Sequence, residues 1–328
     1  MSMMQMLLGV GGGGSLDLSG FIKSYAGTGS AKSETTGMSL TDGGLIWIKA
    51  HANSNRHKLI DTIRGAGWNL TANQDLNQTN ETTGLTAFNS DGFSLGGDSE
   101  YNGTSTDYFA FTFPVGENFF DIVDYDGDPD GIDNTNPRAI SHNLGTKPGF
   151  IIVKRYDDTG HDWIVWHTSL SSGDFLKLNG TALPAGNSGY FTTTIPTASN
   201  FYVGDNVDTN GDGKDLIAYL FAEDSEYVKC GKYTASGSSL SVTLGFEPQW
   251  VMLKALSNSS QSNNWFIHFP TSHSGFESDN AILKVNTSDS ASNYGVNGVT
   301  FTSTGFSISG GAFTDAGDWG YVAIAAAG

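Results

Sequence analysis

Short apolar runs separated by polar residues and glycine make up most of the chain. The runs are roughly four to eight residues long and rich in Ile, Val, Phe, Tyr and Trp, while Gly, Asn, Asp and Ser gather between them. This pattern is typical of short β-strands joined by tight turns. Because no stretch keeps the apolar period of a helix together with helix caps, we predict an all-β chain with little helix.

One set of four apolar runs occurs three times, at a spacing of about one hundred residues. The clearest run ends in lysine, and its copies are residues 45–49, 151–154 and 251–254. An opening run precedes it, and two further runs follow it, the last of which begins with aspartate in every copy. Four matched runs in one order indicate internal homology. The other runs are 21–25, 92–96 and 107–111 in the first copy, 121–125, 200–204 and 215–219 in the second, and 228–233, 305–308 and 318–322 in the third.

The three copies predict three tandem units, each an antiparallel β-sandwich with a jelly-roll-like arrangement. Unit 1 spans residues 20–116, unit 2 spans 117–224 and unit 3 spans 225–328. About six to eight short strands per hundred residues suit two packed sheets. The run Ile151–Val153 is apolar on both faces, so we expect it in a central strand that the facing sheet covers on one side and another unit or chain on the other.

The first 19 residues differ from the rest and are predicted to be an attachment segment. An apolar start leads into four glycines, Gly11–Gly14, which favour a flexible link. The start lacks the basic flank and the length of a secretion signal. Two interpretations stay open: a frayed expression remnant, or a methionine-rich plug that inserts into a partner's groove. The apolar residues of the plug are Met3, Met4, Met6, Leu7 and Leu8.

Composition and charge exclude several classes of function. The chain has 16 Lys and Arg against 34 Asp and Glu, a formal net charge of −18, which disfavours nucleic acids and anionic membrane surfaces as partners. No run of 18 apolar residues is present, so we expect no membrane insertion. Cys230 is the only cysteine, which rules out a disulfide within the chain and a zinc site built on cysteines.

Two acidic loops, residues 124–133 and 205–215, carry the D-x-[DN]-x-D-G spacing of calcium loops. The twelfth residue of such a loop should be a glutamate that binds Ca²⁺ through both carboxylate oxygens, but it is Pro137 in the first loop and Tyr219 in the second. Water or carbonyl groups would therefore have to complete the coordination shell of the ion. The alternative is that both loops are polar hairpin tips. No cofactor is required on either interpretation. The candidate Ca²⁺ ligands are Asp126, Asp128, Asp130, Asp208, Asn210 and Asp212.

Three tryptophans are candidates for stacking on a sugar ring: Trp163, Trp166 and Trp265. In a strand, Trp163 and His167 share one face and Trp166 points to the other. One tryptophan can therefore lie in the core while the other lines a surface, and Trp265 repeats this situation in unit 3. The alternative for all three is packing in a core or an interface, where large aromatic side chains dominate.

Known catalytic signatures are missing from the sequence. It has no G-x-S-x-G elbow, no Walker loop and no H-E-x-x-H motif, and its seven histidines show no spacing typical of metal ligands. A pair of glycosidase carboxylates stays open among 34 acidic residues, although nothing singles out a pair. We therefore predict a protein that is not an enzyme.

Five segments carry a resemblance to a known family: 44–49, 59–66, 88–96, 140–145 and 148–155. Through them the chain resembles tail-fibre-like virion proteins of bacteriophages, especially phages of marine and freshwater bacteria. The match covers units 1 and 2, whereas unit 3 departs from it at residues 244–248. The resemblance implies a non-enzymatic component on the tail or capsid surface of the virion, often a homotrimer, and carries over no catalytic residue.

The leading hypothesis is a phage tail fibre or receptor-binding adhesin. Its N-terminal segment would attach it to other tail or capsid proteins, its units would form a rigid shaft, and a distal face would bind a glycan of the host surface. A capsid decoration or cement protein and a carbohydrate-binding module are the alternatives. A glycan depolymerase would instead show parallel β-helix repeats of about twenty residues.

Overall fold

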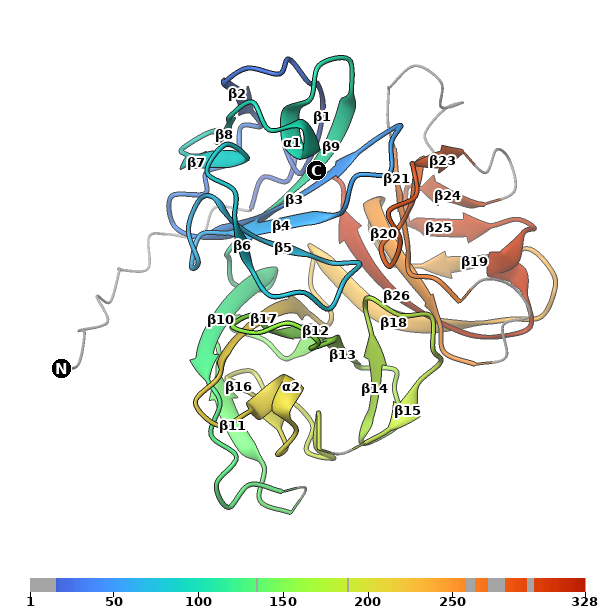
Figure 1. The fold of residues 1–328 in the computed structure, drawn as a ribbon. Coiled ribbons are helices and arrows are strands. Elements are labelled where there is room, and N and C mark those ends of the chain that lie inside the picture. The colour runs from blue at the N-terminus through green and yellow to red at the C-terminus, as the bar shows by residue number, and fades with distance from the viewer. Residues whose placement is uncertain are drawn as a thin grey trace.

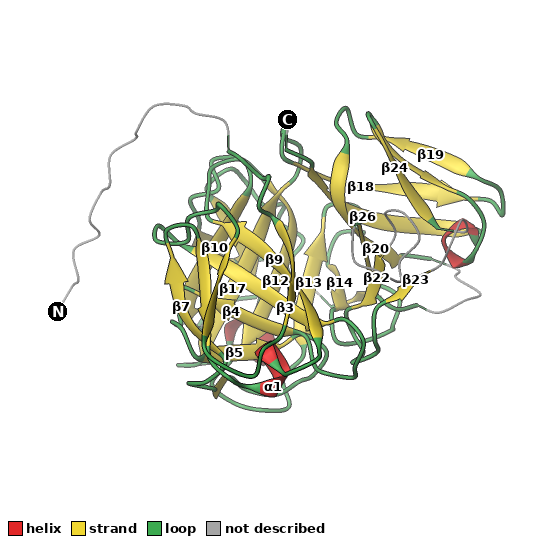
Figure 2. Cartoon of the chain, turned by 90° about the horizontal axis from the view of Figure 1, so that it is seen from above, coloured by secondary structure: helices red, strands yellow, loops and turns green. Residues whose placement is uncertain are grey.

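A computed structural model describes residues 16–133, 135–187, 189–257, 263–270, 281–293 and 298–327. The predicted plug residues, Met3 to Leu8, lie outside this part of the chain. Antiparallel strands build almost all of the body (Figure 2), which confirms the expected all-β fold of β-sandwich type. The described helical turns are short: α1 (Ser99–Asn102), α2 (Val207–Asn210) and a 3₁₀ turn (Ala312–Thr314).

The same large sheet of six strands occurs three times, with the same order of strands relative to the chain. In unit 1 the order is β1 (Ile22–Ala26), β9 (Asp107–Pro114), β3 (Gly44–Ala50), β4 (Lys58–Asp61), β5 (Trp68–Thr71) and β6 (Thr79–Asn80). In unit 2 it is β10 (Phe120–Asp126), β17 (Asp215–Ala222), β12 (Pro148–Arg155), β13 (Trp163–His167), β14 (Asp174–Lys177) and β15 (Ala185–Gly186). In unit 3 it is β18 (Val228–Ala235), β26 (Gly317–Ala325), β20 (Pro248–Ala255), β21 (Phe266–Phe269), β22 (Ala281–Lys284) and β23 (Ser292–Asn293).

A smaller sheet accompanies each large one and completes a two-sheet sandwich. In unit 2 the third strand is reduced to a bridge between Phe191 and Val203. The small sheets are β2 (Lys32–Thr35), β8 (Gly92–Leu95) and β7 (Leu85–Asn89) in unit 1, β11 (Arg138–Ser141) and β16 (Asn200–Val203) in unit 2, and β19 (Leu240–Thr243), β25 (Gly305–Ile308) and β24 (Val299–Thr302) in unit 3.

The three units form lobes around a common centre (Figure 1). They do not follow one another end to end, so the expected shaft is not what this chain forms. Side chains alternate along the central strand of each large sheet: on β3, Leu45 and Trp47 belong to the shared central core, while Ile46 and Ile48 belong to a separate core behind the sheet. The outer cover predicted for strands such as β12 is therefore supplied by the other units of the same chain.

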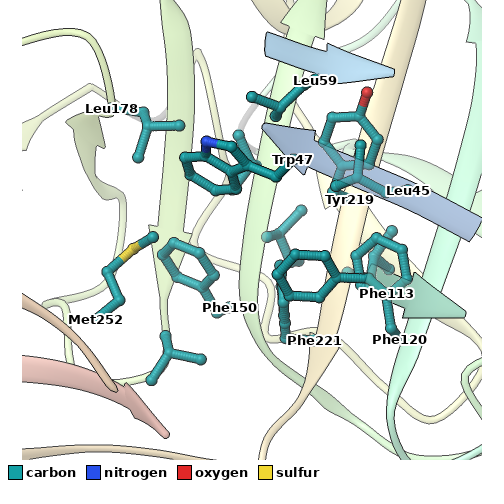
Figure 3. Close-up of a cluster of buried hydrophobic side chains, with 14 of the residues drawn as sticks. Leu45, Trp47, Leu59, Phe113, Phe120, Phe150, Leu178, Tyr219, Phe221 and Met252 are labelled. Atoms are coloured by element: carbon teal, nitrogen blue, oxygen red, sulfur yellow. The ribbon is translucent and has the colours of Figure 1, made fainter. Parts of the chain in front are cut away.

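The central core joins all three units. Figure 3 shows Trp47 of unit 1, Phe150 of unit 2 and Met252 of unit 3 in one cluster of buried side chains. Aromatic rings meet across each boundary, with centroids about 6 Å apart, a separation at which such pairs stabilise beyond the area they bury. These pairs are Phe113–Phe221 at 5.6 Å, Phe150–Trp265 at 6.0 Å and Phe111–Trp250 at 6.3 Å.

A side chain at the same position of each unit forms a hydrogen bond to a neighbouring unit, and the three contacts together close a ring. Trp163, the first residue of β13, pairs with the repeated Lys154. His57 and Trp265 come one residue before β4 and β21, and continuing the strand registers by one residue sets them opposite Lys49 and Lys254. Trp163 Nε1 donates to the carbonyl of Thr71 in unit 1 (3.0 Å), and Trp265 Nε1 donates to that of Lys177 in unit 2 (2.8 Å).

The remaining contact of the ring uses histidine in place of tryptophan. His57 Nδ1 accepts a hydrogen bond from Trp47 Nε1 (3.0 Å), which leaves the proton on Nε2 and lets that atom donate to the carbonyl of Lys284 in unit 3 (3.0 Å). Thr71, Lys177 and Lys284 are the last residues of β5, β14 and β22. Each unit thus contacts the next through the same two surfaces, as in a closed head-to-tail ring.

The repeated lysines are buried and also face the centre. Lys49 Nζ donates to the carbonyl of Asn53 (3.0 Å), Lys154 Nζ donates to that of His161, and Lys254 Nζ donates to that of Thr181 in unit 2 (3.1 Å). Burial lowers the pKa of Lys49 and of Lys154 to about 8 and that of Lys254 to about 7. The most regular motif of the sequence is therefore a structural one.

Candidate functional site

Two of the three candidate tryptophans lie inside the body. Trp163 and Trp265 are 0% and 2% exposed, and both donate their indole N–H across a unit boundary. A sugar cannot reach either ring face in the folded chain. Their burial contradicts the stacking role predicted for them, and the alternative of interface packing describes both.

Trp166 lies on the opposite face of β13 from Trp163, as the strand period predicts. It is half-buried and lines a surface cleft of about 140 Å³, which we call the Trp166 cleft. The equivalent positions in the other units are Ile60 and His268, because each pairs with the residue three places before the repeated lysine. Both of these side chains are fully buried. Only unit 2 opens this position to solvent.

The walls of the Trp166 cleft come mainly from hydroxyl side chains. Thr168 follows β13, Ser171 and Ser172 lie in the turn before β14, and the segment 192–195 faces them. Ile195, at 65% exposed, adds an apolar rim. Hydroxyl groups both donate and accept hydrogen bonds, so this wall can match a ligand that carries many hydroxyl groups of its own. The other lining residues are Lys147, Leu170, Gly173, Thr192, Thr193 and Thr194.

The charges at the cleft are paired. Lys147 Nζ contacts both carboxylate oxygens of Glu223, at 3.0 and 2.9 Å, and Thr168 Oγ1 donates to the same carboxylate. Among the described residues that line the cleft, none is acidic. The cleft therefore offers an aromatic ring, hydroxyl groups and a neutralised ion pair, an arrangement that suits an uncharged polar ligand.

A larger cleft, of about 540 Å³, lies where the described chain begins and ends. It is lined by Leu16–Leu18 on one side and by Tyr227, Phe246 and Ala325 on the other. The backbone N–H of Leu16 donates to the Tyr227 hydroxyl (2.8 Å), which fixes the start of the body against unit 3. The predicted attachment segment joins the body here, on residues other than those of the Trp166 cleft.

The two acidic loops lie side by side. The Gly127 N–H donates to the Lys214 carbonyl (2.8 Å), and the Gly213 N–H donates to the Gly127 carbonyl (2.9 Å). Residues 207–210 of the second loop make the short helix α2, which the Asn206 side chain caps. The spacing that suggested calcium is also satisfied by a capped turn.

Asn210 is a structural tether. Its Oδ1 accepts from the Asp128 N–H (2.8 Å) and from Arg138 Nη1 (2.6 Å), which occupies both lone pairs. Its Nδ2 donates to the carbonyls of Asp128 and Gly204. The role predicted for Asn210 as a calcium ligand is contradicted by these bonds.

Asn102 makes the equivalent bonds in unit 1, where no acidic motif is present: Nδ2 donates to the carbonyls of Ser30 (2.6 Å) and Gly96 (2.7 Å), and Oδ1 accepts from the Thr28 N–H (2.8 Å). An asparagine five residues before the aspartate of the closing strand, in both units, was the available sequence signal for this tether.

The remaining calcium candidates are not gathered into one cluster. Asp208 Oδ1 lies 2.6 Å from His161 Nδ1, and Asp128 accepts from the N–H of Asp130 (3.3 Å). Asp126 and Asp212 are exposed. Within the described ranges, no group of three or more His, Cys, Asp or Glu side chains is placed to hold a metal ion. Calcium at these carboxylates stays a prediction.

Comparisons with known proteins place the chain in a family. In the part of the chain that the structure describes, no helix has the length and apolar character needed to cross a membrane. Searches of curated proteins and of solved structures found no match. The sequence pattern of one protein family matches residues 20–118 and again residues 115–327. Together the two matches cover nearly the whole chain, and the protein therefore belongs to the family described as "Domain of unknown function (DUF7483)".

Proposed function

We propose that this protein binds carbohydrate through the Trp166 cleft and serves as a receptor-binding virion protein of the tail-fibre type. The observation that carries the binding proposal is one half-buried tryptophan in a cleft walled by serine and threonine hydroxyls, on the single unit in which this position is open. The virion assignment rests on the sequence resemblance described above, and the attachment segment would connect the body to other tail or capsid proteins.

The chemistry of the cleft favours a sugar over other small ligands. An indole ring is amphipathic, and its apolar face can cover the C–H face of a sugar ring. Neighbouring hydroxyls can then exchange hydrogen bonds with sugar hydroxyls, and a site built in this way rejects ligands that leave its polar groups unpaired. Lys147 and Glu223 neutralise each other, so no net charge at this cleft selects for an ion.

We propose binding without turnover. Glycoside hydrolysis commonly needs two carboxyl groups about 5–9.5 Å apart across the scissile bond. No acidic residue lines the Trp166 cleft among the described residues, and the nearby Glu223 is held by Lys147 and Thr168. Release of reducing ends from a bound polysaccharide would contradict this part of the proposal.

The test is calorimetric binding to purified bacterial surface polysaccharides and a panel of neutral oligosaccharides. Trp166→Ala should weaken binding about 5- to 150-fold, taking the ~1–3 kcal/mol of a base stacked on an aromatic side chain as the scale for a stacked sugar. Trp68→Phe is the matched control, because Trp68 is the only other half-buried tryptophan of the chain and lies in β5 of unit 1. Equal binding by the wild type and Trp166→Ala would refute the proposed site.

A further inference from the structure

A second cleft, of about 190 Å³, adjoins the Trp166 cleft. It is lined by Ser169 and Asp174 of unit 2 and by Lys232, Ser257 and Asp318 of unit 3, so it lies at the boundary between two units; we call it the boundary cleft. Leu170 and Ser171 line both clefts and separate one from the other. The two clefts therefore form one continuous stretch of surface that runs from unit 2 onto unit 3.

The size of the two clefts indicates a ligand that occupies both. Sites for drug-sized ligands are usually about 300–1,000 Å³ in volume. The Trp166 cleft at about 140 Å³ and the boundary cleft at about 190 Å³ are each below this range, and only together do they reach it. A single sugar can fill the first cleft, whereas a linear oligosaccharide can follow the surface into the second.

The boundary cleft is polar and carries negative charge. Lys232 Nζ lies 2.7 Å from Asp318 Oδ2, and bonds from Lys232 and Thr234 lower the pKa of Asp318, so this pair is ionised and neutralised. Asp174 also lines the cleft and pairs with no Lys, Arg or His side chain of the described residues. The net charge of the lining is therefore negative, and the whole chain carries −18. Carboxylate or sulfate groups on a ligand would be repelled here.

From these observations, and resting on the proposed function, we infer that the ligand is a linear oligosaccharide of at least three sugars without acidic substituents, which spans the Trp166 cleft and the boundary cleft. Trp166 would hold one sugar by stacking. Ser169, Ser257 and Asp174 would exchange hydrogen bonds with the hydroxyl or amide groups of the third and later sugars, which lie beyond Leu170 and Ser171.

The experiment is a series of chain lengths. Cello-oligosaccharides and N-acetylglucosamine oligomers of one to six sugars serve as neutral probes, and oligogalacturonates of the same lengths serve as acidic probes. For a neutral series that binds, the dissociation constant should fall at least tenfold between the disaccharide and the tetrasaccharide. Oligogalacturonates should bind at least tenfold more weakly than the neutral tetrasaccharide, and Asp174→Asn should reduce that difference.

A variant of the boundary cleft separates this inference from the proposed function. Ser257→Tyr would fill the cleft, and it should bring tetrasaccharide affinity down to that of the disaccharide while leaving the disaccharide unchanged. Ser241→Tyr, on the exposed face of β19 in the same unit, is the matched control. Length-independent binding that still depends on Trp166 would overturn the inference and leave the proposed function standing. Failure of every probe to bind the wild type would count against both.

Discussion

Removal of the Trp163 side chain tests the closed ring of units most sharply. The indole is fully buried, lies 6.4 Å from the Tyr219 ring in a nearly parallel arrangement, and has Lys154 Nζ 5.9 Å from its ring centre. Its N–H donates to the carbonyls of Thr71 and Gln74 in unit 1, both at 3.0 Å. Trp163 therefore contributes a large apolar volume to the shared core and a hydrogen bond across a unit boundary.

The two contributions can be measured with two substitutions. Trp163→Ala leaves a cavity in a well-packed core, and changes of this kind cost about 3–5 kcal/mol. Trp163→Phe keeps most of the ring but removes the N–H, which should cost about 0.5–1.5 kcal/mol for the lost hydrogen bond and more if the two carbonyls stay buried without a partner. Trp166→Ala should cost less than Trp163→Ala, because Trp166 is half-buried at a cleft.

The assay is urea unfolding followed by far-ultraviolet circular dichroism, which does not depend on tryptophan fluorescence. Because the core is shared by all units, we expect one cooperative transition for the wild type. Trp163→Phe should retain carbohydrate binding, whereas Trp166→Ala should lose it. A cost below 1 kcal/mol for Trp163→Ala, or separate transitions for separate units in the wild type, would refute the ring as described.

Three further predictions follow from particular contacts. Burial lowers the pKa of Lys254 to about 7 in the folded state, so the unfolded chain binds more protons than the folded chain between pH 7 and about pH 10.5. In urea titrations, the free energy of unfolding of the wild type should therefore rise by about 2 kcal/mol more than that of Lys254→Met between pH 7 and pH 9. Equal pH slopes for the two proteins would contradict the burial argument. Asn210→Ala and Asn102→Ala should lower the free energy of unfolding by similar amounts of about 1–3 kcal/mol, with or without a calcium chelator. A loss of stability that occurs only for Asn210→Ala, and only when calcium is present, would favour a metal site instead. Light scattering should give the whole protein a mass near 34.8 kDa, that of one chain, because the ring already closes within one chain. About three times that mass would favour the trimer that the resemblance implies.

The strands of the fold were predictable because their signal is local. Apolar runs of period two or with two apolar faces mark β3, β12 and β20, and the three lysine-ended runs are equivalent in the strand registers. The arrangement around a centre was not predictable in the same way. A strand such as β12 that is apolar on both faces requires a cover, but the sequence does not state whether another chain or another unit of the same chain supplies it.

For the candidate site, too, the local sequence pattern predicted some features, whereas contacts between distant segments were not predictable. Alternation correctly separates Trp163 from Trp166, yet both faces of β13 are apolar, so the pattern does not state which face a unit boundary covers. Thr192–Thr194 join the Trp166 cleft through contacts between segments about 25 residues apart, which no local pattern encodes. The calcium role predicted for Asn210 was wrong because Asp, Asn and Gly at this spacing also form a capped helical turn, and the Asn210 side chain bonds to the protein itself.

The most direct measurement of the central claim is acrylamide quenching of tryptophan fluorescence in the Trp68→Phe protein. With Trp68 replaced, Trp166 is the only tryptophan that is not buried, since the other five are at most 2% exposed. Acrylamide is neutral, so the charge of −18 does not repel it. A bound neutral tetrasaccharide should protect Trp166 and reduce the quenching constant toward the value for buried indoles. Carbohydrate binding that leaves the quenching of Trp166 unchanged would contradict the claim that this cleft is the binding site.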